Sequence, residues 1–334
     1  MEDVECLEQY NLQDNEKLSI IPFTNDDEWL ELRRQGIGGS DIGAIMGLNS
    51  YSSPLKVYKQ KVEGMVEDLS GNVFVKKGKE LENLILTNYV KPYFKKLGYE
   101  VGKPDFMIVN ADYPYFRANV DGIAYNKGSS YKDNIIVEIK WVSEWAEVNW
   151  NKPEYKGIPA SYYAQVQEYM LVTGATSAVV CALFDKNWEM NYFVIPRDSM
   201  FILEMITKGQ DFYRKQMLMK IPPRLDYELD KEEVAKSIKE APKDLVPNEQ
   251  MTRLIETYLA NNIKIKKAEE VQAEIKNRIL ELANNGFCPD NPDHKVKTSV
   301  ITSHKFNQSK FKEEHADLYE QYCEDSESPR LTIK

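Results

Sequence analysis

The chain has 334 residues, of which 42% are hydrophobic and 29% charged, as in a globular protein with one large domain and a smaller one. Its formal net charge of −10 neither indicates nor excludes a nucleic-acid partner, because the net charge of a chain does not determine the electrostatic potential at one part of its surface. Lysines cluster at 76–79, 91–96 and 264–267. The apolar runs are far shorter than the roughly 20 residues of a membrane helix, and residues 1–18 are acidic and polar. We therefore expect no signal or transit peptide, no membrane span and a cytoplasmic location.

The cysteines and histidines exclude several chemistries. The cysteines are widely scattered, without a CxxC pair, which argues against a zinc ribbon, an iron–sulfur cluster and a disulfide framework: Cys6, Cys181, Cys288 and Cys323. All three histidines (His294, His304 and His315) lie near the C-terminal end. Residues 1–293 therefore hold no Ser-His-Asp triad and no HExxH zinc site. Chemistry in the large domain must use carboxylates, lysine, hydroxyls or a hard metal ion.

Hydrophobic periodicity and turn residues predict alternating helices and strands in the first two thirds of the chain. The expected elements are helices at 26–34, 40–46, 54–61 and 74–97, strands at 99–109, 115–125 and 135–141, a helix at 159–172, strands at 178–184 and 188–195, and a helix at 198–218. A glycine-rich loop, residues 35–39, precedes the second helix. This order predicts an α/β fold in which helices flank a central mixed sheet.

The remainder of the chain predicts a mainly helical region. Residues 225–245 are charged and predict a linker, and a long helix is expected over about 248–284. The spacing of the long helix alternates between four and three residues at Leu254, Tyr258, Asn261, Ile265, Ala268, Gln272, Ile275, Ile279 and Leu282. Either a coiled-coil arm or one helix of a hairpin against its own domain fits this spacing. A strand at 295–301 and a short helix at 311–322 complete the expectation, with domains at 1–224 and 225–334.

The strongest chemical signal is Asn119-Val120-Asp121-Gly122 followed by Ile135-Ile136-Val137-Glu138-Ile139-Lys140. Strand alternation places Glu138 and Lys140 on one face. Isolated charges in such an apolar strand are costly unless they are paired or bind a metal, and a divalent cation with a phosphate supplies the partner. Asp121 reaches the same face if the two strands form a hairpin. The alternative is an exposed Glu–Lys pair on an edge strand.

Hard Mg²⁺ prefers oxygen ligands, so Asp121, Glu138 and the Ile139 backbone carbonyl form a plausible ligand set. The bound ion would lower the pKa of a water and neutralise charge that develops on a phosphate. Lys140 would hold that water or the transition-state oxygens. One or two ions fit this chemistry, and Mn²⁺ is expected to substitute.

The chain resembles the YqaJ-like viral recombinase family, which includes the phage lambda exonuclease. The matching blocks span about residues 26–200 and occur in the family's order: Trp29-x-x-x-Arg33, Gly36-Ile37-Gly38-Gly39-Ser40-Asp41-Ile42, Gly78-Lys79-Glu80-Leu81-Glu82, Asn119-Val120-Asp121-Gly122, Val137-Glu138-Ile139-Lys140 and Tyr163-Ala164-Gln165-Val166-Gln167-Glu168-Tyr169-Met170. The resemblance implies a PD-(D/E)xK restriction-endonuclease-like core. It also implies exonuclease digestion of linear double-stranded DNA, 5′ to 3′, which leaves single-stranded 3′ overhangs for recombination by strand annealing.

The resemblance also implies roles for further residues. Glu82 matches the family's helical acidic residue, a metal ligand, although a solvated helix face would explain Glu82 alone. Gln165 with Tyr169 matches a Q-x-x-x-Y element that supports the metal site or contacts DNA, and simple core packing is the alternative. Gln167 is an alternative contact.

Arg33 and Ser40 match a pocket for a terminal 5′-phosphate. Elementary chemistry agrees, because the loop through Gly39 ends at a helix N-terminus, where backbone N–H groups, a hydroxyl and an arginine can bind an anion. The alternative is that Ser40 only caps its helix.

The family further implies a ring-shaped trimer, a single-strand annealing partner, and a phage or prophage origin in a bacterial host, with no membrane partner. Two other functions remain open on the same fold: a restriction-type endonuclease and a non-catalytic DNA-binding module. The related iron–sulfur nucleases are disfavoured by the missing cysteine cluster.

Overall fold

The computed structural model describes residues 8–12, 15–66, 71–242, 246–291, 294–324 and 328–333. Cys6 and part of the acidic N-terminal segment lie outside the described residues. The chain divides into two compact units, Met1–Val234 and Ala235–Lys334. No helix among the described residues is both long enough and apolar enough to cross a membrane.

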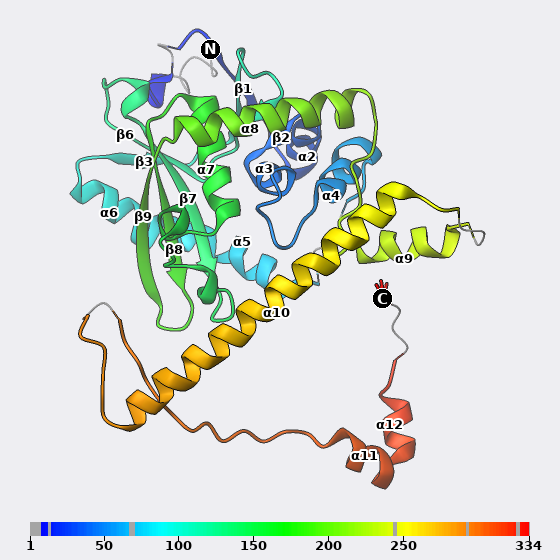
Figure 1. Ribbon diagram of the computed structural model, residues 1–334. Helices are drawn as coiled ribbons and strands as arrows, with labels where there is room; N and C mark the ends of the chain where they lie inside the picture. Colours follow the sequence, from blue (N-terminus) through cyan, green and yellow to red (C-terminus); the bar gives the residue numbers. More distant parts are fainter. Residues whose placement is uncertain are drawn as a thin grey trace. The chain divides into compact units, whose positions relative to one another are not determined.

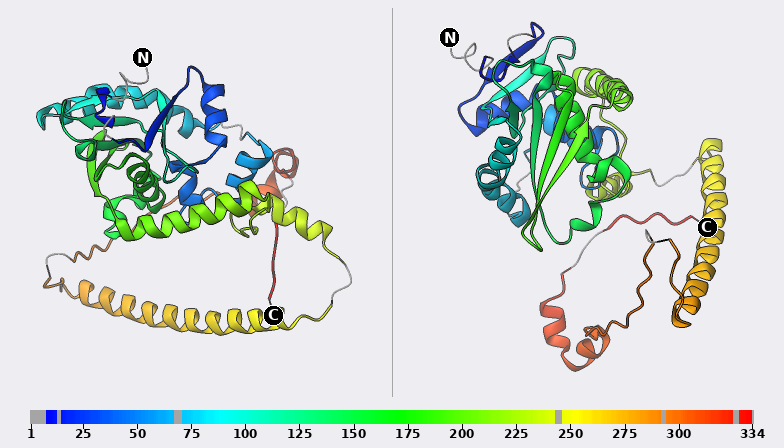
Figure 2. Two further views of the ribbon diagram at one scale, coloured as in Figure 1. Left: turned by 90° about the horizontal axis from the view of Figure 1, so that it is seen from above. Right: turned by 90° about the vertical axis from the view of Figure 1, so that its left-hand side faces the viewer.

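The first unit contains a five-stranded mixed sheet, as the element order predicted. In the order of the sheet the strands are β3 (Glu100–Gly102), β6 (Gly122–Tyr125), β7 (Ile135–Val142), β8 (Ser177–Phe184) and β9 (Glu189–Pro196) (Figure 1). β7 and β8 are parallel, and the other neighbouring pairs are antiparallel. The parallel pair requires a crossover, which α7 (Ala160–Thr173) supplies. The right-hand view of Figure 2 also shows strands of this sheet side by side.

Helices cover both faces of the sheet. On one face, Val137 and Ile139 of β7 pack in a cluster with residues of α5 (Val73–Ile85), η3 (Leu86–Val90) and α6 (Lys91–Lys96). On the other face, Ile136 packs in a larger cluster with α7. The single helix expected over 74–97 is therefore a continuous α–π–α run. The predicted fold class, a mixed sheet between helices, is confirmed.

Several short elements hold the glycine-rich loop beside α7. α2 (Asp26–Arg34) leads into β2 (Ile37–Gly38) and α3 (Gly39–Ile45). β2 pairs in parallel with β5 (Phe116–Arg117), which anchors the loop. A separate antiparallel pair, β1 (Leu18–Pro22) with β4 (Phe106–Asn110), was not predicted as its own sheet.

The end of the first unit differs from the linker expected over 225–245. After α8 (Ser199–Phe212) and η7 (Tyr213–Leu218), the segment includes α9 (Lys231–Glu240). Asp230 is buried because it accepts a hydrogen bond from Ser53, which also caps α4 (Pro54–Tyr58). The linker prediction was wrong here, because a charged composition does not reveal that these charges have buried partners.

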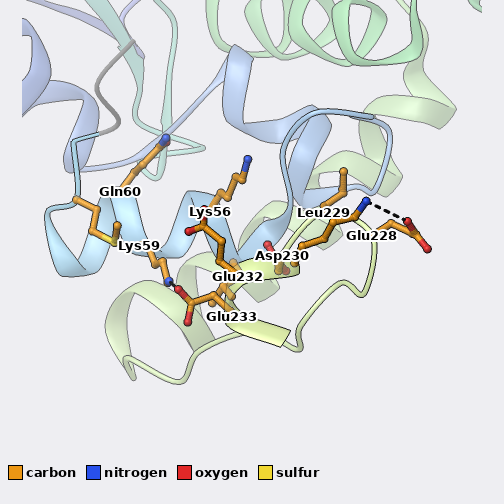
Figure 3. Close-up of a pocket in the computed structure, with 11 residues that line it drawn as sticks. Lys56, Lys59, Gln60, Glu228, Leu229, Asp230, Glu232 and Glu233 are labelled. Atoms are coloured by element: carbon orange, nitrogen blue, oxygen red, sulfur yellow. Dashed lines mark hydrogen bonds and ion pairs between the residues drawn. The ribbon is translucent and has the colours of Figure 1, made fainter. Parts of the chain in front are cut away.

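A cavity of about 460 Å³ lies between this segment and the helices α4 and η2 (Lys59–Glu63). Figure 3 shows Lys59 and Glu233 facing each other across the cavity, where they form an ion pair. None of the expected catalytic residues lines this cavity. We therefore assign it to the packing of the segment that ends the unit, and not to the chemistry.

The second unit is mainly helical, as predicted. Its helices are α10 (Glu249–Asn284), which Asn248 caps, α11 (Gln308–Glu314) and α12 (Ala316–Gln321). The strand expected at 295–301 is absent from the described residues, because no other segment there pairs with it. The single helix expected over 311–322 is broken at His315, whose backbone angles are not helical.

Candidate active site

Strand β7 brings Glu138 into the interior of the first unit. Its side chain lies on the same face as Ile136, between the sheet and α7, and is only 1% exposed. The hydrophobic sequence around Glu138 buries the whole strand, so its carboxylate is removed from water together with its apolar neighbours. An ionised carboxylate in such a position is costly unless a cation or hydrogen bonds compensate it.

Asp121 lies directly beside β7. The pairing of β6 with β7 ends where Gly122 lies opposite Val137, so the N–H of Ile139 is beyond this ladder. That N–H donates a hydrogen bond of 2.8 Å to Asp121 Oδ2. The N–H and C=O of one strand residue point to the same side, so the Ile139 carbonyl opens toward the side that holds Asp121. The hairpin on which the prediction depended is present.

Lys140 neutralises part of the buried negative charge. Its ammonium forms a close ion pair with Glu138 and lies 4.8 Å from the centre of the Tyr162 ring. Burial alone would lower the pKa of Lys140, but Glu138 and Asp121 outweigh burial and hold that pKa above its usual value. Lys140 therefore stays protonated and can donate to an anionic oxygen.

The two carboxylates are held in a destabilised state. Burial raises the pKa of Asp121 well above its usual value, and the nearby Glu138 raises it further. Burial also raises the pKa of Glu138, against the opposing effect of Lys140. Two carboxylates and one ammonium leave an excess of negative charge that a cation would compensate.

Glu138 supplies a direct test of whether a metal fits. Its Oε2 atom is buried and has no hydrogen-bond partner among the described residues. This free acceptor, Asp121 and the Ile139 carbonyl are all oxygen donors, the kind that Mg²⁺ prefers. The donor set therefore fits a hard divalent cation.

Glu82 on α5 is less closely associated with this set. Its carboxylate binds Lys103 Nζ at 2.7 Å, although it is close enough to raise the pKa values of Asp121 and Glu138. Within the described residues, no three His, Cys, Asp or Glu side chains are grouped so that they could hold a metal. The structure thus brings Asp121, Glu138 and Lys140 together and places Glu82 at the margin, in an ion pair with Lys103 that no motif indicated.

The Q-x-x-x-Y element lies on α7, behind the carboxylates. Gln165 donates a hydrogen bond of 2.9 Å from Nε2 to the hydroxyl oxygen of Tyr169, and both side chains are buried. Burial, then Glu138 and Asp121, raise the pKa of Tyr169 well above its usual value, which places the phenol near the negative charge. Gln167 instead bonds to Pro196 and Asp198, so it joins α7 to the start of α8.

The glycine-rich loop forms the second part of the site. Arg33 Nη2 donates to Ser40 Oγ at 2.6 Å, and the Arg33 guanidinium lies 4.7 Å from the centre of the Trp29 ring. The side chains of Arg33 and Ser40 are therefore held together at the N-terminus of α3. This arrangement suits an anion, because a hydroxyl, a guanidinium and backbone N–H groups converge there.

Beneath the loop lies a buried charge cluster that sequence reasoning did not identify. Asp41 accepts from the N–H of Gly38 and pairs with Lys61 Nζ at 2.6 Å, and Lys61 also donates to the Arg33 carbonyl. Burial would raise the pKa of Asp41, but Lys61 and Arg33 outweigh it and hold that pKa low. Asp41 was part of a family block but had no role, and no local pattern marked Lys61.

A groove of about 740 Å³ runs past this loop. Its lining includes Trp29 and five cationic side chains: Arg33, Arg34, Lys61, Lys76 and Lys79. The local charge is therefore positive although the chain is acidic overall.

Residues 28–176 match the model of the YqaJ-like viral recombinase domain. The chain is also 27% identical over 317 residues to the uncharacterized protein YqaJ of Bacillus subtilis (strain 168), a match that covers 92% of this chain and 94% of that protein. The match over residues 28–176 confirms the resemblance to the YqaJ-like viral recombinase family that was drawn from the motifs.

Solved structures similar to this chain include two structures of one alkaline exonuclease and a phage related exonuclease. The alkaline exonuclease from Laribacter hongkongensis has 21% identity and a TM-score of 0.44, and its complex with dAMP has a TM-score of 0.46. Both matches cover 58% of this chain and 93% of the other. A phage related exonuclease from Haemophilus somnus 129PT has 16% identity and a TM-score of 0.41, over 58% of this chain and all of the other.

The buried carboxylates generate a prediction about stability. Because the pKa of Asp121 is raised in the folded state, folding stability is lost as pH rises from the unfolded value through the folded value. Asp121→Asn keeps an acceptor for the Ile139 N–H without the charge. We expect this variant to be more stable than the natural chain near neutral pH, because it removes the buried negative charge that is costly in the folded state.

Urea unfolding in EDTA at several pH values measures this difference. The gain should grow from pH 4 to pH 8 and then level off. A gain that is constant with pH, or a loss of stability at pH 8, would contradict the assigned burial of the charged carboxylate.

Proposed function

We propose that this protein is a Mg²⁺-dependent exonuclease that degrades linear double-stranded DNA from its ends. The proposal depends on one observation, the buried set of Asp121, Glu138 and Lys140, in which a Glu138 oxygen has no hydrogen-bond partner among the described residues. A catalytic metal site explains why so costly an arrangement lies in the middle of an apolar strand. The match of residues 28–176 to the YqaJ-like viral recombinase domain supports it.

Asp121, Glu138 and the Ile139 carbonyl would hold the ion or ions, with Glu82 as a further ligand once it leaves Lys103. When bound, Mg²⁺ supplies a water of lowered pKa and neutralises charge on the phosphodiester; Mn²⁺ is expected to substitute. Lys140 keeps its proton and donates to an oxygen of the scissile phosphate. Gln165 and Tyr169 back the carboxylates and limit access of bulk water.

The glycine-rich loop at residues 35–39, with Arg33 and Ser40 on either side, is the reason to favour an exonuclease. We call this segment the anion loop. Arg33 and Ser40, with the backbone at Gly39, would bind a terminal 5′-phosphate, and the cationic groove would hold the neighbouring backbone. A clamp on the 5′ end gives polarity, since each cut exposes a new 5′-phosphate. We therefore propose 5′-to-3′ digestion that leaves single-stranded 3′ overhangs for recombination by strand annealing.

Assembly and partners rest on the family resemblance. We propose a ring-shaped trimer that acts with a single-strand annealing protein, encoded by a phage or prophage and active in the bacterial cytoplasm. Residues 225–334 are the candidate assembly or partner-docking region, because α10 has no buried residue and exposes apolar side chains such as Ile265, Ile275 and Ile279.

The function is tested with the purified full chain, Mg²⁺ and matched DNA substrates. Linear duplexes with and without a 5′-phosphate are compared with closed circular DNA, and EDTA serves as the control. We expect loss of linear DNA only, faster with the phosphate, and no reaction in EDTA. Cutting of closed circles would indicate a restriction-type endonuclease, and inertness with intact binding would indicate a non-catalytic DNA-binding module.

The central residues generate a second prediction. Alanine at Asp121, Glu138 or Lys140 should lower the cleavage rate by at least about 100-fold, the usual scale for the loss of a metal ligand or charge-stabilising group, while DNA binding survives. Initial rates on 5′-phosphorylated duplex and a gel-shift assay in Ca²⁺ measure the two properties. Glu144→Ala, an exposed acid just beyond β7, is the matched control. Near-normal cleavage by any of the three variants would refute the role of that residue.

The anion loop generates a third prediction. Arg33→Ala should slow 5′-phosphorylated ends by roughly 10-fold or more and leave 5′-hydroxyl ends nearly unchanged, because a charge-assisted bond contributes about 1.5–3 kcal/mol. The ratio of the two rates is the measurement. Arg34→Ala is the control, since Arg34 contacts the Gly64 carbonyl and not Ser40. Equal slowing of both ends by Arg33→Ala would remove the phosphate-pocket assignment.

A further inference from the structure

Gly39 makes an unusually close contact between the anion loop and α7. A Cβ atom at this position would lie 2.6 Å from Tyr169 Cε1, 2.9 Å from Tyr169 Cζ and 2.9 Å from Gln165 Cγ. Ordinary van der Waals contact begins at 3.4 Å, so any side chain here requires the loop or the ring to move. Only glycine lets the backbone of the loop rest on the Tyr169 ring.

The Tyr169 ring connects this contact to the carboxylates. Its hydroxyl accepts from Gln165, and the ring is buried in the same core cluster as Ile136, which lies on the face of β7 that carries Glu138. The ring is buried, and because buried side chains are closely packed it has little room to turn aside. Tyr169 therefore packs both against the loop and in the core cluster beneath the Glu138 face of β7.

A second glycine shows that the contact extends along α3. A Cβ at Gly43, one helical turn after Gly39, would lie 3.1 Å from Ser161 Cα and 3.1 Å from Ser161 Cβ, close to the α7 backbone. The distance between α3 and α7 is thus set by contacts with backbone atoms and an aromatic ring. Such contacts are more rigid than contacts between long flexible side chains.

The loop is also held from its other side. Asp41 accepts from the Gly38 N–H and pairs with buried Lys61, and β2 is paired with β5. Ser40, adjacent to Gly39, is bonded to Arg33. A displacement at Gly39 would therefore move Ser40, because the chain has little freedom between the two residues.

We propose that Gly39 is a positioning residue that, through Tyr169, sets the distance between the bound 5′-phosphate and the phosphodiester cut at Asp121 and Glu138. This inference rests on the proposed function and deepens it. The terminal phosphate is held at Arg33 and Ser40, the cut occurs at the carboxylates, and the Gly39–Tyr169 contact is the rigid spacer between them. The spacer selects which bond, counted from the 5′ end, lies at the metal site.

Gly39→Ala tests the inference. The added Cβ falls about 0.8 Å short of ordinary contact with the ring, and a misplacement of about 1 Å can cost about 100-fold in rate. We expect 5′-phosphorylated ends to be cut 10- to 100-fold more slowly, while 5′-hydroxyl ends, which do not use the clamp, change by less than threefold. Duplexes labelled at the 3′ end report the first cut position, which should become heterogeneous.

Gly174→Ala is the matched control for a purely structural effect. Its Cβ would lie 2.7 Å from Tyr131 Cε2, a similarly close contact with an aromatic ring that belongs neither to the glycine-rich loop nor to its partner strand β5. It should lower the melting temperature and leave both the phosphate-to-hydroxyl rate ratio and the first cut position unchanged. If the control variant changed the phosphate-to-hydroxyl rate ratio as much as Gly39→Ala does for the same loss of melting temperature, the proposal would be overturned.

Tyr169→Leu supplies the second variant, because it removes the ring atoms that Gly39 contacts. In the Tyr169→Leu background, the additional effect of Gly39→Ala on the rate ratio should fall to a small fraction of its effect in the natural chain. If Gly39→Ala does not fold, Tyr169→Leu alone should still make the first cut heterogeneous, since it removes the spacer without a clash. An unchanged cut position in Tyr169→Leu would overturn the proposal.

The outcomes distinguish a failure of the proposed function from a failure of the Gly39 inference. A natural chain that does not cut DNA ends overturns the proposed function and the inference together. An active natural chain whose Gly39→Ala variant keeps the same rate ratio and the same cut position overturns the inference alone.

Discussion

The burial of Glu138 in the middle of β7 is the constraint on which the rest of the structure depends. The strand is apolar on both sides and must lie between two helical layers, so its carboxylate is taken out of water with it. Lys140 on the same face and Asp121 at the end of the neighbouring strand then become partners that the fold cannot lose without leaving a buried charge uncompensated. Stability and chemistry compete here, because the same charges that weaken the folded state are the ones that can bind a cation.

The fold and the core of the site could be predicted from the sequence because both are encoded in short-range patterns. Alternation of polar and apolar residues placed Glu138 and Lys140 on one face of one strand, and the expected hairpin with the preceding strand brought Asp121 beside it. The same logic gave the sheet, its helical layers and the mainly helical C-terminal region. These features depend on neighbours along the chain or on the next strand.

The features that could not be predicted depend on long-range partners. The buried Asp41–Lys61 pair joins residues from two separate helical segments, and the buried Asp230 accepts a hydrogen bond from Ser53, which is distant in the sequence. Lys103 binds Glu82 from a loop that carries no motif. The strand expected at 295–301 failed for the converse reason, since its alternation has no partner strand among the described residues. Local sequence indicates which secondary structure a segment favours. Whether that structure forms depends on a partner segment that can be distant in the sequence.

A crystal structure of the full chain in Mn²⁺ most directly tests the central claim that the buried carboxylates are a cation site. We predict an anomalous difference peak within ligand distance of Asp121, Glu138 and the Ile139 carbonyl, and no such peak in crystals of Glu138→Gln. Crystals that diffract well in excess Mn²⁺, with Glu138 still paired to Lys140 and no density between the carboxylates, would contradict the account.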